Sequence, residues 1–503
     1  NVIKRDYPVM VMIGNPPYNG VSQNNGDWIT GLITDYKKEP GGIVKLQEKK
    51  TWLNDDYVKF IRLAEYYISK NDNGIIGFIT NRSYIENPTF RGMRWHLMKS
   101  FDSIYVIDLH GDTKESIEND DNVFDIQQGV CISLFVKTGL KEKNELGKVY
   151  HSEIIGSREY KYQTLTELNW CVDNFKELIP IKPYYFFVPK NDEGKEEYDR
   201  GFSFSELIVN KSSGSASAND TLNISFTKDE QILKINELIN LPEQDWRTRS
   251  GRKNDSRDWT YKTAKADAEL HYSEIHEMAY RPFDIRYTCY TGNSRGLYAS
   301  PQSAILNNLK DKINVALCTV KTSRDYLFPI FIVNRIVDKT LLSPKDNVTV
   351  FPLYIYKENM GEEERIANFN RDLYDKIAKG LNYLPCYDDN VLVDPTPDYN
   401  GVLYPQDLFD YIYAVLHSPG YRERYKEFLK IDFPRIPHPT DKEKYRNMVA
   451  LGKELRQLHL MEDLPHQAGV SFPVGGTLQV DCYRWEQNRV YINAEQYFEG
   501  VPE

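Results

Sequence analysis

The first 138 residues alternate between short apolar runs and amphipathic segments, and this alternation constrains the fold more than any other feature of the sequence. Apolar runs typical of strands lie at 8–13, 75–80, 104–109 and 130–136. Residues 57–68 place apolar side chains at helical spacing, and residues 90–100 predict a second helix. The order strand, helix, strand, helix, strand, loop, strand predicts an α/β sheet with crossover helices, and it accounts for only half of a doubly wound fold.

The remaining residues are organised differently. Residues 139–200 are mixed and polar, and the small, polar stretch at 210–220 has the composition of a linker. From about 220 to 400 short β-type runs alternate with turns, and two helices are expected at 406–430 and 441–461. We therefore predict a half-sheet domain at 1–145, a connector at 146–220, and an α+β domain at 221–503 that includes a helical segment at 406–461.

The composition excludes several classes of protein. The 503 residues carry a formal net charge of −10, which argues against a surface coated with basic residues for nonspecific nucleic-acid binding. No run of about 18 apolar residues is present, so no transmembrane helix is expected. The six cysteines lack C-x-x-C spacing, and the nine histidines form no H-x-x-x-H or H-E-x-x-H pair, so we expect neither a disulfide framework nor a metal site. We expect a cytoplasmic protein that does not act at a membrane.

The strand at 8–13 leads into Asn15-Pro16-Pro17-Tyr18, the motif that carries chemistry. The N6 amine of adenine is a poor nucleophile because its lone pair is delocalised into the ring. An enzyme that methylates it needs acceptors for both N–H groups. The side-chain oxygen of Asn15 is one acceptor, and the carbonyl of Pro16, held by the stiff Pro-Pro backbone, is the second. Tyr18 offers a ring face to a base taken out of its stack, so positioning and aimed dipoles do the work without a metal.

This tetrapeptide after a strand resembles motif IV of the amino-methyltransferases, which use S-adenosylmethionine. The stretches that resemble motifs V, VI, VII and VIII of that family follow in order at 55–68, 74–94, 103–111 and 122–137. The resemblance implies that Asn15, Pro16, Pro17 and Tyr18 form the catalytic set. It also implies that Phe124, at the position of the motif VIII aromatic residue, packs against the flipped adenine.

Longer stretches narrow the resemblance. The segments at 51–60, 278–290, 334–354 and 409–439 resemble the C-terminal part of Type ISP restriction–modification enzymes, the LlaGI and LlaBIII group. In those single polypeptides a nuclease and an ATP-dependent translocase precede a methyltransferase and a target-recognition domain. The resemblance covers nearly the whole chain and implies site-specific N6-adenine methylation of double-stranded DNA by base flipping, in a bacterial cytoplasm. ATP and Mg are then needed only by the other domains of the full-length enzyme.

One part of the family pattern lies outside the sequence. In the family, a Gly-rich cofactor loop and an acidic ribose ligand precede the NPPY motif, whereas only 14 residues precede Asn15. No GxxxxGK[ST] loop is present, so no ATPase is encoded here. We expect S-adenosylmethionine to be bound mainly by an upstream segment, and this chain alone to be inactive as a methyltransferase.

A basic and aromatic stretch at 245–262 is the expected DNA reader. Its cations suit phosphate and groove contacts, and Trp246, Trp259 and Tyr261 are interleaved with them. The predicted DNA-binding residues are Arg247, Arg249, Arg252, Lys253 and Arg257, together with Arg281 and Arg286 beside a Pro turn. The segment 321–326 is a weaker candidate, and a solvated loop is the alternative interpretation of 245–262.

Two other functions remain open from the sequence. An NPPY enzyme can instead methylate a protein glutamine or an RNA base, because those nitrogens pose the same chemical problem. The roughly 360 residues after motif VIII argue against a glutamine enzyme, which needs little beyond that motif. Alternatively, the chain is a non-catalytic DNA specificity module, because the cofactor-binding motif is not part of it.

Overall fold

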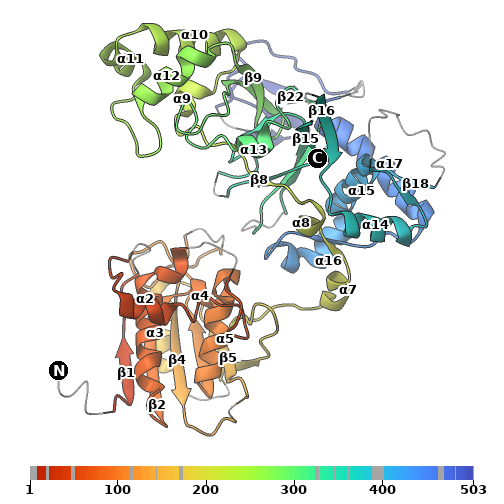
Figure 1. The fold of residues 1–503 in the computed structure, drawn as a ribbon. Helices are drawn as coiled ribbons and strands as arrows, with labels where there is room; N and C mark the ends of the chain where they lie inside the picture. Colours follow the sequence, from red (N-terminus) through yellow and green to blue (C-terminus); the bar gives the residue numbers. More distant parts are fainter. Residues whose placement is uncertain are drawn as a thin grey trace. The chain divides into compact units, whose positions relative to one another are not determined.

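The computed structural model divides the chain into two compact units, Asn1–Glu193 and Gly194–Glu503, which we describe separately (Figure 1). The described residues are 8–18, 22–46, 51–113, 117–142, 144–168, 174–322, 328–344, 346–359, 362–387, 401–462, 469–481 and 483–501. Within these ranges, no helix is both long enough and apolar enough to cross a membrane.

The first unit is built on a mixed six-stranded sheet (Figure 1). In spatial order its strands are β1 (Val11–Gly14), β2 (Gly74–Asn81), β4 (Val130–Lys137), β3 (Ser103–Asp108), β5 (Lys148–Glu153) and β6 (Lys176–Leu178). β1 is parallel to β2 and β3 is parallel to β5, whereas β4 lies antiparallel between β2 and β3. The carboxyl ends of β1, β2 and β3 therefore meet at one edge of the sheet.

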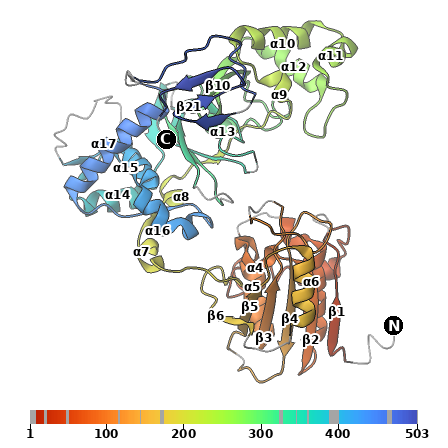
Figure 2. The same cartoon turned by 180° about the vertical axis from the view of Figure 1, so that it is seen from behind.

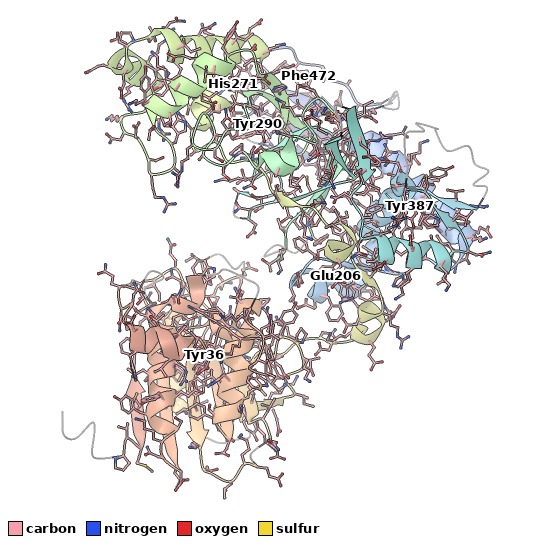
Figure 3. The ribbon with its side chains drawn as sticks, viewed as in Figure 1. Tyr36, Glu206, His271, Tyr290, Tyr387 and Phe472 are labelled. Carbon is pink, nitrogen blue, oxygen red and sulfur yellow. The ribbon has the colours of Figure 1, made fainter. Side chains whose placement is uncertain are left out.

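Helices α3 (Asp56–Ile68) and α5 (Arg91–Ser100) cover one face of this sheet (Figure 1). Their apolar sides are buried with Ile76 and Phe78 of β2 in the main core of the unit. Tyr36 lies in this core (Figure 3). Its hydroxyl donates a hydrogen bond of 2.8 Å to the buried carboxylate of Glu65. The shorter helices are α2 (Asp27–Ile33), η1 (Thr51–Asn54), α4 (Ser83–Glu86) and η2 (Pro88–Phe90). Each strand and helix predicted for the first 138 residues has an observed counterpart, and the α/β fold class is confirmed.

A further helix, α6 (Arg158–Glu167), lies on the opposite face of the sheet (Figure 2). The side chain of Ser157 caps it by accepting a hydrogen bond from the amide of Tyr160. Beneath it lies a smaller group of buried side chains, which we call the carboxyl-edge cluster: Ile107, Leu109, Val123, Val130, Ile154 and Phe175. β5, α6 and β6 all fall in the stretch predicted as a connector, so this part of it belongs to the sheet unit.

The outer strand β1 leaves apolar side chains exposed. Among the described residues β1 pairs only with β2. Val11 and Ile13 are 57% and 80% exposed, and Ile75, the register partner of Val11, is 39% exposed. Register partners in parallel strands share a face and side chains alternate along each strand, so these three residues lie on one face of the sheet. We call Val11, Ile13 and Ile75 the exposed apolar strip.

The second unit contains two cores and several small sheets (Figure 1). One sheet is formed by β10 (Asp284–Cys289), β9 (Ile275–Arg281) and β13 (Ile336–Val337), and another by β12 (Ile330–Val333), β11 (Ala316–Thr319), β14 (Thr349–Pro352) and β8 (Ser212–Ser213). Helices α10 (Lys228–Asn240), α11 (Glu243–Ser250) and α12 (Tyr261–His271) bury their apolar sides in the core that contains the first of these sheets. The remaining elements are α7 (Lys195–Asp199), β7 (Phe202–Ser203), α8 (Phe204–Leu207), α9 (Asp220–Asn223), α13 (Ser303–Leu306), β15 (Tyr354–Asn359), β16 (Glu362–Ala367), α14 (Arg371–Gly380), β17 (Leu384–Pro385), β18 (Val402–Leu403), β19 (Arg435–Ile436), β20 (Arg484–Glu486), β21 (Arg489–Tyr491) and β22 (Tyr497–Glu499).

The helical segment near the C-terminus consists of α15 (Pro405–His417), α16 (Pro419–Leu429) and α17 (Lys442–His459). The single helix predicted at 406–430 is therefore wrong. The first helix ends before Pro419, because proline has no N–H for a helical hydrogen bond. The side chain of Ser418 caps the helix that follows, α16. α15 and α17 pack together and are joined by a buried ion pair between Asp410 and Arg456.

Candidate functional site

The NPPY motif follows β1 directly, at the edge where the carboxyl ends of β1, β2 and β3 meet. In open α/β sheets ligands bind outside the carboxyl ends of the strands. Asn15 and Pro17 are exposed, Pro16 is buried and Tyr18 is half-buried. The side-chain amide of Asn15 is therefore accessible to a ligand at this edge. Pro16 is held in position because neighbouring residues bury it.

Tyr18 connects the motif to the neighbouring strand. Its hydroxyl donates a hydrogen bond of 2.6 Å to Oδ1 of Asn15 and lies 3.3 Å from the carbonyl oxygen of Ile79, near the end of β2. The ring packs against both the main core and the carboxyl-edge cluster. Burial, with a smaller effect of the neighbouring Cys131, raises the pKa of Tyr18 to about 12. At neutral pH the hydroxyl is therefore a neutral donor that orients the Asn15 side chain.

Phe124 lies in the loop between β3 and β4, whose start is at the same edge of the sheet. Its ring is half-buried and packs against the carboxyl-edge cluster, as does the ring of Tyr18. The structure therefore brings the NPPY motif and the predicted stacking residue to one cluster, although Tyr18 and Phe124 are far apart in the sequence.

Two sets of contacts at this edge have no signature in the sequence, although Asp108 itself stands where loop residues after a strand often line a ligand cleft. Arg82, directly after β2, makes charge-assisted hydrogen bonds of 2.9 and 2.7 Å to the carboxylate of Asp108 at the end of β3, and both side chains are buried. Burial of Asp108 opposes its ionisation, but Arg82 holds the pKa of Asp108 below its ordinary value. Arg158, Lys161 and Tyr162 of α6 contact the loop that carries Phe124. Their partners are distant in sequence, so residue spacing gave no signal for them.

The first two predicted DNA-binding cations are engaged in ion pairs within the second unit. Arg247 pairs with Glu243 and with Asp255, each at 2.7 Å. Arg249 pairs with Glu237 at 2.9 Å, while its own side chain stays 65% exposed. The charge of Arg247 is thus balanced by two carboxylates before any ligand arrives, which weakens its attraction for a phosphate.

Of the three predicted cations in the loop after α11, two are exposed. Lys253 is exposed, and the side chain of Arg257 is 90% exposed and pairs with the adjacent Asp258. The guanidinium of Arg252 lies 4.4 Å from the ring centroid of Trp259, a cation–π contact. Lys253 and Arg257 are therefore the members of the predicted set that are freest to meet a phosphate.

The aromatic residues of the stretch 245–262 are core residues: Trp246 lies in α11, Trp259 in the loop after it and Tyr261 at the start of α12. Trp246, Trp259 and Tyr261 are all buried, and their rings pack against each other in the core beneath α10 to α12. The interpretation of these rings as part of a contact surface is wrong, because each is buried among apolar side chains. Their contribution is to fix the fold of the loop on which the cations lie.

Arg281 and Arg286 lie on the β9–β10 hairpin, in the same unit. Arg281 pairs with Asp338 at 3.0 Å, and Arg286 contacts Asp284 in the same strand. The guanidinium of Arg286 also lies 3.5 Å from the ring centroid of Phe226, an exposed residue. Arg281 is thus held by a residue that follows β13, and Arg286 by a residue of its own strand and by the ring of Phe226.

Three further observations concern the described residues alone. No group of three or more His, Cys, Asp or Glu side chains among them could hold a metal ion. The four cysteines within the described ranges, Cys131, Cys289, Cys318 and Cys386, are free thiols. Most of the weaker candidate segment 321–326 lies outside the described residues.

Comparisons with known families identify both units. Residues 10–114, which include the NPPY motif and β1 to β3, match the model of the Eco57I restriction-modification methylase. The first unit is therefore a methylase region of the restriction–modification class. Residues 206–503, more than half of the chain, match the model of the Type ISP C-terminal specificity domain. The chain belongs to the Type ISP restriction–modification family, as its motifs predicted.

Solved structures share this fold. The ATP-dependent Type ISP restriction–modification enzyme LlaBIII bound to DNA matches 99% of the chain with a TM-score of 0.72 and 21% identity, and the DrdV–DNA complex matches 98% with a TM-score of 0.70 and 23% identity. A nuclease-deletion mutant of the Type ISP enzyme LlaGI, in complex with a DNA substrate mimic, matches 98% with a TM-score of 0.68 and 20% identity. The chain spans 33%, 50% and 46% of these proteins, respectively. No curated protein sequence matched the chain.

Proposed function

We propose that this chain is the methyl-transfer and target-recognition portion of a single-polypeptide restriction–modification enzyme that methylates the N6 nitrogen of adenine in double-stranded DNA. The observation that carries the proposal is the exposed Asn15 amide, oriented by Tyr18 at the carboxyl edge of the sheet. The chain belongs to the Type ISP family and is similar in structure to two enzymes that were solved with DNA. Both findings support DNA as the partner.

Each residue of the motif has a distinct role in this proposal. Oδ1 of Asn15 and the main-chain carbonyl of Pro16 accept the two N6–H groups, which leaves the nitrogen lone pair directed at the methyl donor. The rings of Tyr18 and Phe124 hold the adenine after it has left the duplex, because stacking on an aromatic ring contributes about 1–3 kcal/mol per base. Both rings are anchored on the carboxyl-edge cluster, so the base pocket is held by the sheet itself.

S-adenosylmethionine supplies the methyl group when it is bound. Asn15 and its neighbours fit the side of such a site that binds the methyl acceptor. Among the described residues, no strand pairs with the outer edge of β1, so none there could carry a cofactor-binding loop. The exposed apolar strip supports a further segment that packs on this face of the sheet beside β1, because Val11, Ile13 and Ile75 would then be covered. We therefore propose that a segment upstream of β1 holds most of the cofactor, and that the chain by itself transfers no methyl group.

The second unit is the proposed reader of the DNA site. Among the predicted cations Lys253 and Arg257, and then Arg249 and Arg252, are the proposed phosphate contacts, whereas Arg247, Arg281 and Arg286 are more firmly held by carboxylates. A reader joined to the methylase in one polypeptide fixes which adenine enters the pocket. ATP and Mg belong, in this proposal, to nuclease and translocase segments elsewhere in the same polypeptide, which acts on DNA in the cytoplasm.

The test uses the parent polypeptide with the segment upstream of β1, purified with and without the substitution Asn15→Ala. We expect methylation of adenine in duplex DNA by the unsubstituted protein and its loss with Asn15→Ala, at unchanged DNA affinity. The matched control is Asn73→Ala, an exposed asparagine before β2 at the other end of the strand, which should keep full activity. Labelling of RNA or of a protein glutamine in place of DNA would contradict the proposal. If the parent bound DNA but methylated nothing, the remaining interpretation would be a non-catalytic DNA specificity module.

A further inference from the structure

The loop that carries Phe124 is held by α6 through an unusual set of contacts. Four consecutive main-chain carbonyls, those of residues 121–124, each accept a hydrogen bond from an α6 side chain. Arg158 donates to the carbonyls of Asn122 at 2.8 Å and Phe124 at 3.2 Å. The hydroxyl of Tyr162 donates to the carbonyl of Val123 at 2.7 Å.

The fourth carbonyl is bound by Lys161, the residue that anchors α6. Its side chain is completely buried, and Nζ donates to the carbonyls of Asp121 at 2.6 Å and Leu109 at 2.7 Å. Its third contact is the carboxylate of Asp120 at 2.6 Å. The ammonium thus uses all three of its donors, as a buried charge requires.

Asp120 extends this contact to two other parts of the backbone. Its carboxylate accepts hydrogen bonds from the amide of Gly111 at 2.7 Å and from the amide of Gly156 at 3.0 Å. One buried ion pair therefore joins the end of β3, the Phe124 loop and the turn before α6. Although burial favours the protonated acid, Lys161 and these two amides hold the pKa of Asp120 below its ordinary value.

α6 is poorly suited to be a simple cover for the sheet. Lys161 is the one fully buried residue of the helix. The only aliphatic residue of α6 is Leu165, which is partly buried against the carboxyl-edge cluster, and its two tyrosines are largely exposed. A helix that only shields a sheet presents a stripe of apolar side chains. The contacts that α6 makes through charged and hydroxyl groups are instead directed at one loop, and that loop carries the predicted stacking residue.

We propose that α6 is a positioning element of the base-binding site, in which Lys161 anchors the helix and Arg158 and Tyr162 hold the backbone of residues 122–124, up to and including Phe124. The inference rests on the proposed base-flipping function. Carbonyls bound at fixed distances determine where the loop backbone lies, and the backbone determines where the ring of Phe124 meets the base. The segment 115–205, which contains α6, lies between the two ranges that the family models match.

The test combines Arg158→Gln with Tyr162→Phe in the parent polypeptide. Both side chains reach solvent, so the fold is retained while the hydrogen bonds to residues 122–124 are weakened. We expect single-turnover methylation to slow by about tenfold, because misplacing a reacting group by a fraction of an ångström has effects of this size. Affinities for DNA and S-adenosylmethionine should stay within about twofold of the original. Tyr160→Phe, at a similarly exposed tyrosine of the same helix, is the matched control and should be neutral.

Two readouts separate positioning from general stability. The fluorescence of 2-aminopurine at the target position should change as it does with Phe124→Ala. Adding the α6 double substitution to Phe124→Ala should cause no further loss of rate, because the effect of α6 acts through that ring. Full activity of the double variant, or strictly additive losses, would overturn the inference. If the unsubstituted parent methylates no adenine, the proposed function fails instead, so the two failures are distinguishable.

Discussion

The hydroxyl of Tyr18 lies 2.6 Å from the side-chain oxygen of Asn15, three residues earlier in the same motif. The same hydroxyl lies 3.3 Å from the carbonyl of Ile79, so the motif is tied to the adjacent strand β2. A free asparagine side chain would have to be ordered as the base binds, at a cost in entropy. Tyr18 therefore serves two purposes: it orients the acceptor and presents a ring.

The two roles of Tyr18 are separable by substitution. Tyr18→Phe keeps the ring and removes the hydrogen bond, whose net value is about 1 kcal/mol, so we expect methylation to slow about fivefold. Tyr18→Ala also removes the stacking surface and should slow it at least about tenfold further. Single-turnover methylation by the parent polypeptide is the measurement, with DNA affinity as the control. Equal rates for the two variants would show that the ring carries no part of the effect.

The exposed apolar strip predicts opposite effects in two contexts. In this chain alone, replacing Val11 and Ile13 by Thr should reduce self-association without lowering the melting temperature, because both side chains face water. In the parent polypeptide the same change should lower the melting temperature, because the proposed upstream segment would cover the strip. Light scattering and thermal unfolding measure the two effects. Leu140→Thr, at an exposed position in a loop of the same unit, is the control. Identical behaviour in both contexts would argue against a covering segment.

Local sequence patterns were sufficient to predict the strands and helices that form the site. The apolar run of β2 and the helical spacing of α3 were evident because each depends on neighbouring residues alone. The NPPY motif was recognisable because its chemistry is contained in four consecutive residues. The contact between Lys161 and Asp120 was not predictable, because a lysine on a polar helix has the pattern of a solvated residue.

The stretch 245–262, which comprises the end of α11, a loop and the start of α12, illustrates the opposite error. A stretch rich in both cations and aromatic residues has the composition of a nucleic-acid surface, yet Trp246 and Trp259 are buried. Composition records which residues are present and carries no information on which side of the loop they lie. Long-range packing against α10 and α12 decided that, and such packing has no short-range signature in a single sequence.

The environments of the loop cations predict different effects on DNA binding. Lys253→Ala and Arg257→Ala should each reduce the slope of log affinity against log salt by about one, since each removes a phosphate contact. Arg247→Ala should change that slope less, because Glu243 and Asp255 already balance its charge. Titrations of a specific duplex at several salt concentrations measure the slopes. An unchanged slope for the double variant of Lys253 and Arg257 would remove this loop from the interface.

The buried pair of Arg82 and Asp108 predicts a stability effect at the strand ends. Arg82→Met should destabilise the first unit by about 3–5 kcal/mol, because a carboxylate is left buried without its partner. The double variant Arg82→Met/Asp108→Leu should lose less stability than Arg82→Met alone, because no charge is then left buried without its partner. Lys148→Met, which breaks the exposed pair with Glu177, should change stability by less than about 1 kcal/mol. Urea unfolding measures all three, and a double variant less stable than Arg82→Met would contradict the account.

The same pair contributes a defined pH dependence. The pKa of Asp108 is lower in the folded protein than in the unfolded chain, so the folded state binds fewer protons at acidic pH. Its stabilisation is complete above the unfolded pKa of about 3.9 and is lost as the pH falls through the lower folded value. In the variant that lacks both Arg82 and Asp108, the unfolding free energy should fall less steeply below about pH 4.

His417 at the end of α15 predicts a second pH dependence, in the other unit and at higher pH. Burial, with smaller effects of Arg422 and His459, lowers the pKa of His417 to about 3. Its Nδ1 accepts a hydrogen bond of 3.2 Å from Arg422, and its ring contacts those of Tyr413 and His459. The folded state therefore keeps this imidazole neutral, whereas the unfolded chain protonates it below about pH 6.5.

The sign of this effect follows from proton binding. Between about pH 6.5 and pH 3 the unfolded state binds one more proton at His417, so stability falls as the pH is lowered, by up to about 1.4 kcal/mol per pH unit. His417→Gln retains a polar side chain that does not titrate, and it should make the curve of unfolding free energy against pH shallower in that range. The measurement is urea unfolding at several pH values between pH 4 and pH 7, in which the transition of the second unit is followed. A curve as steep as that of the unsubstituted chain would show that His417 is already protonated in the folded protein, in contradiction to its burial beside Arg422.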